Sequence, residues 1–182
     1  MKSLALLLIV ALLTAAAVHA ADAADPKAVA LVRAMRSDEI AVSGAKRAFL
    51  NGALEEKYPG TEAKCVKRIG YADFTGPFSR VVGQAMTPEE IDQALKFYQS
   101  DAGVKYVEGM LRRLRTRFGD DSGIPKIPGD EVITPKQTAE IAEFTRSDLG
   151  HKITGKEMTE SPAALQFGRQ MLEQIAEKCT RK

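Results

Sequence analysis

The stretch MTPEEIDQALKFYQSDAGVKY, residues 86–106, predicts two helices joined by a short capped turn. Thr87 can cap the first helix, Pro88 fits its first position, and Glu90 can reach back to complete a capping box. Ser100 is placed to cap the second helix. Apolar residues at helical spacing follow both caps: Ile91, Ala94, Leu95, Tyr98, Tyr106, Val107, Met110, Leu111 and Leu114. We call this arrangement a helix–elbow–helix unit.

The same pattern returns 47 residues later. Seven residues are identical at this offset, and most of them suit caps or turns: Thr134, Pro135, Phe144, Ser147, Asp148, Gly150 and Lys152. The sequence therefore predicts two related units, at about 87–118 and 134–158. Residues 119–131 between them are rich in Gly and Pro and predict an exposed connecting loop. Because two copies are too few for a solenoid, we expect a globular bundle.

The sequence on either side of the two units also predicts helices. Ser37 is expected to cap a long helix, and Ser161 to cap the last one. The expected helices run over about 26–35, 37–57, 61–69, 76–84 and from 162 onward. No long run alternates apolar and polar residues as strands do. The expected fold is all-α, a compact bundle of about seven or eight helices in one domain, residues 21–182.

Residues 1–20 have the pattern of a signal peptide. Lys2 precedes an apolar run, Leu4–Leu13, and small residues flank a cleavage point after Ala20, with Ala23 as the alternative. The apolar run is too short to span a bilayer, and no later stretch is apolar enough, so we expect a soluble protein in the periplasm of a Gram-negative bacterium. The formal net charge of the chain is only +2, which argues against nucleic-acid binding.

The two cysteines, Cys65 and Cys179, predict one disulfide, because an even number of cysteines in an oxidising compartment usually pairs. The bond would close a loop of more than a hundred residues, for which the chain-entropy model gives roughly 4–5 kcal/mol. The alternative, a metal site or a redox pair, lacks histidine neighbours and a Cys-x-x-Cys spacing.

Three features of the first unit resemble an exported bacterial family known as domain of unknown function 2059. They are the helix start from Thr87 to Ile91, the Phe-Tyr-x-Ser step that ends at Ser100, and the Gly-x-Lys that ends at Lys105. Ile91 stands where leucine is usual and Asp101 where proline is common, but Asp also suits a first helical turn. The resemblance implies a helical periplasmic protein and no particular activity, because none is established for the family.

Two short motifs resemble catalytic or phosphate-binding sequences but lack their companions. Ser43 and Lys46 match the Ser-x-x-Lys of penicillin-binding enzymes, without the Ser-Asp-Asn and Lys-Thr-Gly elements. Residues 150–157 look like a phosphate-binding loop, but Glu157 replaces the hydroxyl residue and a helical context replaces the required strand. A solvated helix face is the favoured interpretation of the first motif, and a helix elbow that of the second.

His151 is the only histidine after the signal peptide, so it cannot build a common zinc site. It would serve as a general base only beside an orienting carboxylate, and we expect a half-buried packing residue. The acidic pairs Asp120-Asp121 and Asp130-Glu131 do not have the spacing of an EF-hand and predict a solvated loop. We therefore expect no enzyme activity, no cofactor and no metal.

The strongest candidate for a binding surface is a run of arginines near the end of the first unit: Arg112, Arg113, Arg115 and Arg117. These cations suit the carboxyl end of a helix and keep its face solvated. Alternatively they form an anion-binding edge for acidic lipid headgroups, a cell-wall polymer or an acidic protein.

Taken together, these patterns favour a non-enzymatic interaction module of the cell envelope, with an unknown protein or an acidic envelope component as partner. An inhibitor or immunity-type protein against a toxin or hydrolase stays open, as does a carrier of an apolar ligand. An enzyme of unfamiliar type would need His151 beside a carboxylate in a pocket.

Overall fold

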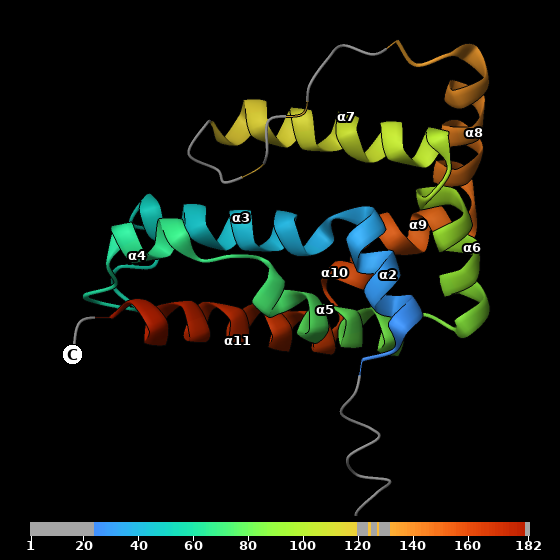
Figure 1. Cartoon of the computed structure of the whole chain (residues 1–182). Helices are drawn as coiled ribbons and strands as arrows, with labels where there is room; N and C mark the ends of the chain where they lie inside the picture. Colours follow the sequence, from blue (N-terminus) through green and yellow to red (C-terminus); the bar gives the residue numbers. More distant parts are fainter. Residues whose placement is uncertain (1–23, 120–123, 125–126, 128–131, 181–182) are drawn as a thin grey trace, which may run out of the picture.

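The computed structural model describes residues 24–119, 124, 127 and 132–180. The helices in this part of the chain are α2 (Pro26–Met35), α3 (Ser37–Leu50), α4 (Ala63–Arg68), α5 (Ala72–Ala85), α6 (Pro88–Tyr98), α7 (Asp101–Phe118), α8 (Pro135–Arg146), α9 (Asp148–Thr154), α10 (Lys156–Thr159) and α11 (Pro162–Cys179). Figure 1 shows their arrangement. The same residues contain no strand, only an isolated bridge between Thr61 and Thr180, so the all-α prediction is confirmed.

The helices that precede and follow the two units pack together in the lower part of Figure 1, where α3, α4, α5 and α11 surround one apolar cluster. Phe74, Val66 and Ile175 are fully buried there. The predicted disulfide is confirmed: the sulfur atoms of Cys65 and Cys179 are 2.01 Å apart and join α4 to α11 across 114 positions of the chain. Beside the bond, the Glu62 amide donates to the Cys179 carbonyl at 2.8 Å.

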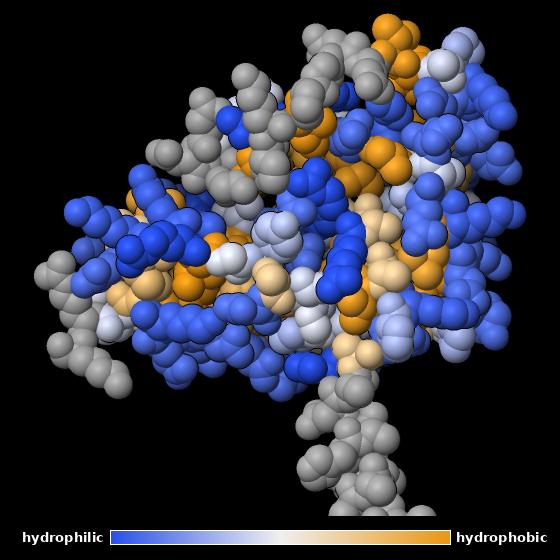
Figure 2. All heavy atoms as spheres, viewed as in Figure 1, coloured by the Kyte–Doolittle hydropathy of each residue, from blue (hydrophilic) through white to orange (hydrophobic). Residues whose placement is uncertain are grey.

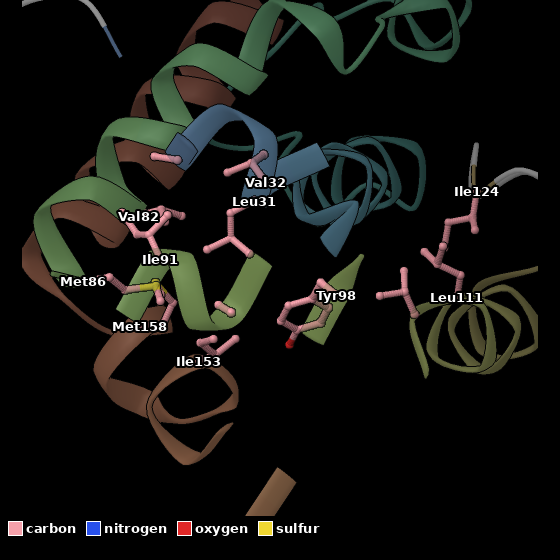
Figure 3. Close-up of a cluster of buried hydrophobic side chains, with 13 residues drawn as sticks. Leu31, Val32, Val82, Met86, Ile91, Tyr98, Leu111, Ile124, Ile153 and Met158 are labelled. Carbon is pink, nitrogen blue, oxygen red and sulfur yellow. The ribbon is translucent and has the colours of Figure 1, made fainter. Parts of the chain in front are cut away.

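A second cluster joins α2 and α5 to both helix–elbow–helix units. Figure 3 shows Leu31 and Val32 of α2 facing side chains from α5 and α6, with Ile153 and Met158 closing the cluster. Leu31, Val32 and Ile91 are at most 2% exposed. The apolar faces predicted from helical spacing are therefore the buried faces, and α2 lies at the centre of this cluster.

The predicted long helix from Ser37 to Lys57 begins where expected, but its predicted cap and its predicted end are wrong. Ser37 is inside α3 and does not cap it: the residue before it, Arg36, takes the left-handed conformation (φ 52°) and donates both Nε and Nη2 to Glu39. Helix α3 ends at Leu50 because Gly52 turns the chain with φ 77° and the Asn51 side chain accepts from the Ala53 amide.

The helix predicted from Gly76 begins earlier, at Ala72, so Pro77 lies inside α5 and not at its start. Proline cannot donate to the carbonyl of Asp73 one turn back, which weakens the helix locally. Burial compensates for this loss, since Phe74 in the first turn of α5 is completely covered by its neighbours.

Ile124, in the segment that follows the first unit, is more buried than predicted. Residues 119–131 were expected to form an exposed loop, yet Ile124 is only 1% exposed, and Figure 3 shows its side chain beside Leu111 of α7. The expectation is wrong for this residue. The acidic pairs at 120–121 and 130–131 lie outside the described residues, as does the predicted signal peptide.

The second unit departs from the first after its elbow. Where α7 continues for 18 residues, α9 stops after 7 at Gly155, and a single turn, α10, follows. Among the helices described, none has both the length and the apolarity needed to cross a lipid bilayer.

Candidate functional site

The first helices of the two units begin with the same capping box. In α6, the Glu90 amide donates to Thr87 Oγ1 at 3.2 Å and the Thr87 amide donates to Glu90 Oε2 at 2.8 Å. In α8, Gln137 and Thr134 exchange the same two bonds at 3.2 and 2.9 Å. Both boxes satisfy amides that a helix start would otherwise leave unpaired, so the caps predicted for both units are confirmed.

The elbows also share one geometry. Ser100 Oγ accepts from the Gly103 amide at 3.1 Å and donates to the Phe97 carbonyl at 2.7 Å. Ser147 makes the equivalent bonds to Gly150 and Phe144 at 3.0 and 2.7 Å. The hydroxyl therefore bridges the end of one helix and the start of the next in both units.

The two units meet through Phe97 and Phe144, which occupy equivalent positions in the two sequences. Their rings are stacked, with centroids 3.7 Å apart and planes only 7° from parallel. Tyr98 packs its ring edge-on against both of them, at 5.2 and 5.4 Å. Tyr98 is 3% exposed, and its burial raises the pKa of the phenol. The aromatic contact fixes the position of α6 relative to α8.

An open groove of about 540 Å³ lies along this aromatic contact. It is lined by Gln93, Lys96, Phe97 and Ser100 of the first unit and by Glu140, Glu143, Phe144, Ser147, Asp148 and Leu149 of the second. Four pairs of these residues are separated by 47 positions: 93 and 140, 96 and 143, 97 and 144, 100 and 147.

The pairing shows that α6 and α8 present equivalent faces to each other. Two units related by translation would bring non-equivalent residues together where they meet, so the pairing indicates an approximate two-fold arrangement of α6 and α8. Figure 1 agrees, since the carboxyl ends of α6 and α8 meet and α7 and α9 leave on the same side. Figure 2 shows hydrophobic residues reaching the surface where these helices come together, while hydrophilic residues cover the outer faces of α6 and α8.

The two walls of the groove differ in charge. The first unit contributes Gln93 and Lys96, whereas the equivalent positions of the second unit are Glu140 and Glu143, followed by Asp148. Glu140 also forms an exposed ion pair, in which its Oε1 lies 3.9 Å from Lys136 Nζ. The groove thus has an aromatic floor, one wall with a single ammonium group and one wall with three carboxylates.

An ion pair holds the second unit against the first. Lys152 Nζ of α9 lies 2.8 Å from both carboxylate oxygens of Glu90, the residue that closes the capping box of α6. The hydrogen bond from Lys152, followed by that from the Thr87 amide, lowers the pKa of Glu90 below its ordinary value. Lys152, which the sequence places in the motif resembling a phosphate-binding loop, is therefore engaged by a carboxylate.

The four arginines singled out in the sequence do not act as one group. Arg115 donates to the carbonyl of Ile124 at 2.6 Å and so anchors the buried part of the following segment. Arg112 is half-buried, whereas Arg113 and Arg117 are exposed. Arg47 of α3 donates to the Arg117 carbonyl at 3.3 Å, which adds a cation at this end of α7. An anion-binding edge would rest mainly on Arg113 and Arg117.

The other residues singled out in the sequence do not line the groove. Ser43 is 4% exposed, so the predicted solvated face is wrong for this residue. Lys46 donates to the Lys67 carbonyl at 3.1 Å, and burial lowers the pKa of its ammonium group. His151 is exposed, so its predicted half-burial is wrong. Residues 150–154 are helical. Within the described ranges, no three His, Cys, Asp or Glu side chains gather as a metal site would require.

Sequence reasoning found Phe97 and Phe144 but missed the groove beside them. The signal was present in the 47-residue offset, because a two-fold arrangement brings equivalent positions face to face. The polar residues that line the groove are exposed or partly exposed: Gln93, Lys96, Glu140 and Glu143. Hydrophobic periodicity predicts only that such residues face solvent, and it does not show that they face each other.

Comparison with known proteins gives one match. No curated protein and no solved structure matches the chain. A family model does match, over residues 75–114, which include α6, its elbow and most of α7. These residues are similar to the bacterial family described as "Uncharacterized protein conserved in bacteria (DUF2059)", the family that the motifs between Thr87 and Lys105 resemble.

Proposed function

We propose that this protein is a non-enzymatic binding module of the bacterial cell envelope and that it holds a partner protein in the groove between α6 and α8. The observation that carries the proposal is the groove itself, in which stacked Phe97 and Phe144 form an aromatic floor between polar walls. Aromatic side chains surrounded by a polar rim are typical of protein interfaces.

The rigidity of the groove supports a binding role. Both helices that form it are held by capping boxes at one end and by serine bridges at the other, and Lys152 ties α9 to α6. A surface that is already ordered loses little conformational entropy when a partner binds. The groove is also open to solvent, which suits a segment of a protein better than an enclosed apolar ligand.

Location in the periplasm is part of the same proposal. It is supported by the signal-peptide pattern of residues 1–20 and by the disulfide between Cys65 and Cys179. Mass spectrometry of the protein isolated from the producing bacterium tests it, with a mature chain beginning at Ala21 as the expected result. A cytoplasmic protein that retains Met1 would contradict it.

Photo-crosslinking in the producing bacterium tests the groove. A photoreactive amino acid replaces Gln93, exposed on the rim, or, as a matched control, Gln170, exposed on α11. We expect a defined adduct of one size from position 93 and none of that size from position 170. Equal adducts from both positions, or none from position 93, would refute the groove as the binding site.

A further inference from the structure

We infer that the groove between α6 and α8 takes a cationic segment of a partner protein, with an apolar side chain of that segment resting on Phe97 and Phe144. The inference rests on the proposed function and adds the chemistry and the orientation of the occupant. It follows from three features of the groove: its excess of carboxylates, their position on one wall only, and the aromatic floor beneath them.

The excess of carboxylates favours a cation. Glu140, Glu143 and Asp148 face the groove against Lys96 alone. Lys136 offsets part of the charge of Glu140, and the positive amino end of α9 offsets part of that of Asp148. Glu143 has neither compensation: in the part of the chain that the structure describes, it forms no ion pair and is exposed. It is therefore the main attractor for a positive group.

The asymmetry of the walls orients the occupant. The two-fold arrangement places equivalent phenylalanines on the floor. The equivalent wall positions 96 and 143, however, carry an ammonium group and a carboxylate. A segment that lies across the floor can pair its cations with the α8 wall, while the α6 wall repels them. Such a charge difference across one groove specifies the direction of binding more than its strength.

The aromatic floor favours an apolar side chain in the partner segment in addition to its cations. The equivalent rings of Phe97 and Phe144 present apolar surface that a purely hydrophilic segment would leave in contact with water. An apolar side chain covers that surface, and an arginine can lie flat on a ring while its guanidinium reaches Glu143. A groove of about 540 Å³ accommodates a few side chains, so a short linear segment suffices.

Three synthetic peptides test the inference by fluorescence anisotropy with the full mature chain. One carries arginines around a central phenylalanine, the second replaces the arginines by glutamates, and the third replaces the phenylalanine by alanine. We expect the first to bind at least about tenfold more tightly than either of the others, and to weaken as salt is raised. Amide chemical-shift changes should centre on Phe97 and Phe144.

Charge variants on the rim sharpen the test. Glu143→Lys should weaken binding of the arginine peptide about three- to tenfold, and Lys96→Glu should strengthen it by a similar factor. Glu173→Lys on α11 makes the same charge change at an exposed position that does not line the groove and should leave the affinity unchanged. Because Lys96→Glu predicts a gain, a failure to fold cannot imitate the expected result.

The outcomes separate this inference from the proposed function. Preferential binding of the glutamate peptide with shifts at Phe97 and Phe144 would overturn the charge assignment and leave the groove as the binding site. A weakening by Glu173→Lys equal to that by Glu143→Lys would overturn it as well, since net charge alone would then explain binding. A crosslink at position 93 without binding of the arginine peptide would refute the inference alone.

Discussion

The backbone carbonyl oxygen of Phe97 lies 2.0 Å from the place that a Cβ atom on Gly103 would occupy. The second unit repeats this relationship between Phe144 and Gly150, again at 2.0 Å. Both elbows therefore bring the end of one helix so close to the start of the next that only glycine fits. The Ser-x-x-Gly spacing in the two units is a requirement of backbone packing as well as of capping.

Substitution of alanine for this glycine should be strongly destabilising. Gly103→Ala forces α6 and α7 apart and should lower the free energy of unfolding by at least about 2 kcal/mol, measured by urea denaturation. Gly109→Ala is the control on the same helix, since its Cβ would meet only the end of the Arg113 side chain at 4.0 Å. That variant should gain about 0.5–1 kcal/mol. Equal effects of the two changes would contradict the close approach at the elbow.

The ion pair between Glu90 and Lys152 should make stability depend on pH. The pKa of Glu90 is lowered in the folded state, so its contribution is present above the ordinary value of 4.5 and is lost as the pH falls through the folded value. Glu90→Gln keeps the capping box, as Gln137 does in α8, and removes only the charge. It should cost about 0.5–1 kcal/mol at pH 7. The difference should shrink as the pH falls below 4.5 and vanish below the folded pKa of Glu90. A difference that stays constant from pH 7 into this acidic range would argue against the pair.

The stacked rings of Phe97 and Phe144 should be energetically coupled. Replacing either ring by leucine should cost about 1–2 kcal/mol, because the partner loses its stacking contact in both cases. A double-mutant cycle should give a coupling of about 0.5–1.5 kcal/mol. Phe97→Leu combined with Phe49→Leu, whose ring packs on Tyr58, is the additive control. Full additivity of Phe97→Leu and Phe144→Leu would show that the rings do not support each other.

Loss of the disulfide should destabilise the chain without altering the groove. Replacing both Cys65 and Cys179 by alanine should lower the free energy of unfolding by about 2–5 kcal/mol. Dithiothreitol should have a comparable effect on the wild-type protein and none on the variant. Binding of the arginine peptide should persist in both under native conditions, because α6 and α8 lie in the other apolar cluster. Loss of peptide binding by the folded variant would contradict this separation.

Capping residues and cysteine parity predicted much of this fold. Thr87, Ser100, Thr134 and Ser161 all cap helices where expected, because each side chain acts on amides within three residues of itself. The bond between Cys65 and Cys179 was predicted only from the even number of cysteines and the oxidising compartment expected for the chain. That the two units arose by duplication stays a prediction, although their caps, elbows and aromatic contacts agree in detail.

The errors arose where distant parts of the chain decide the local structure. Phe74 extends α5 back past Pro77 because α3 and α11 cover it, and periodicity in a short segment does not contain that information. Ile124 is buried for the same kind of reason, among Gly and Pro residues that normally mark exposed loops. The groove was missed because it exists only between two helices, and its walls look like ordinary solvent-facing residues in each helix taken alone.

The position of Cys179 limits when the covalent link can appear. It lies in the last turn of α11, so its thiol leaves the ribosome only after every other described helix has been made. The bond between Cys65 and Cys179 therefore cannot form until all the helices between α4 and α11 have been made. Oxidation of this pair is a late event in the life of each newly made molecule.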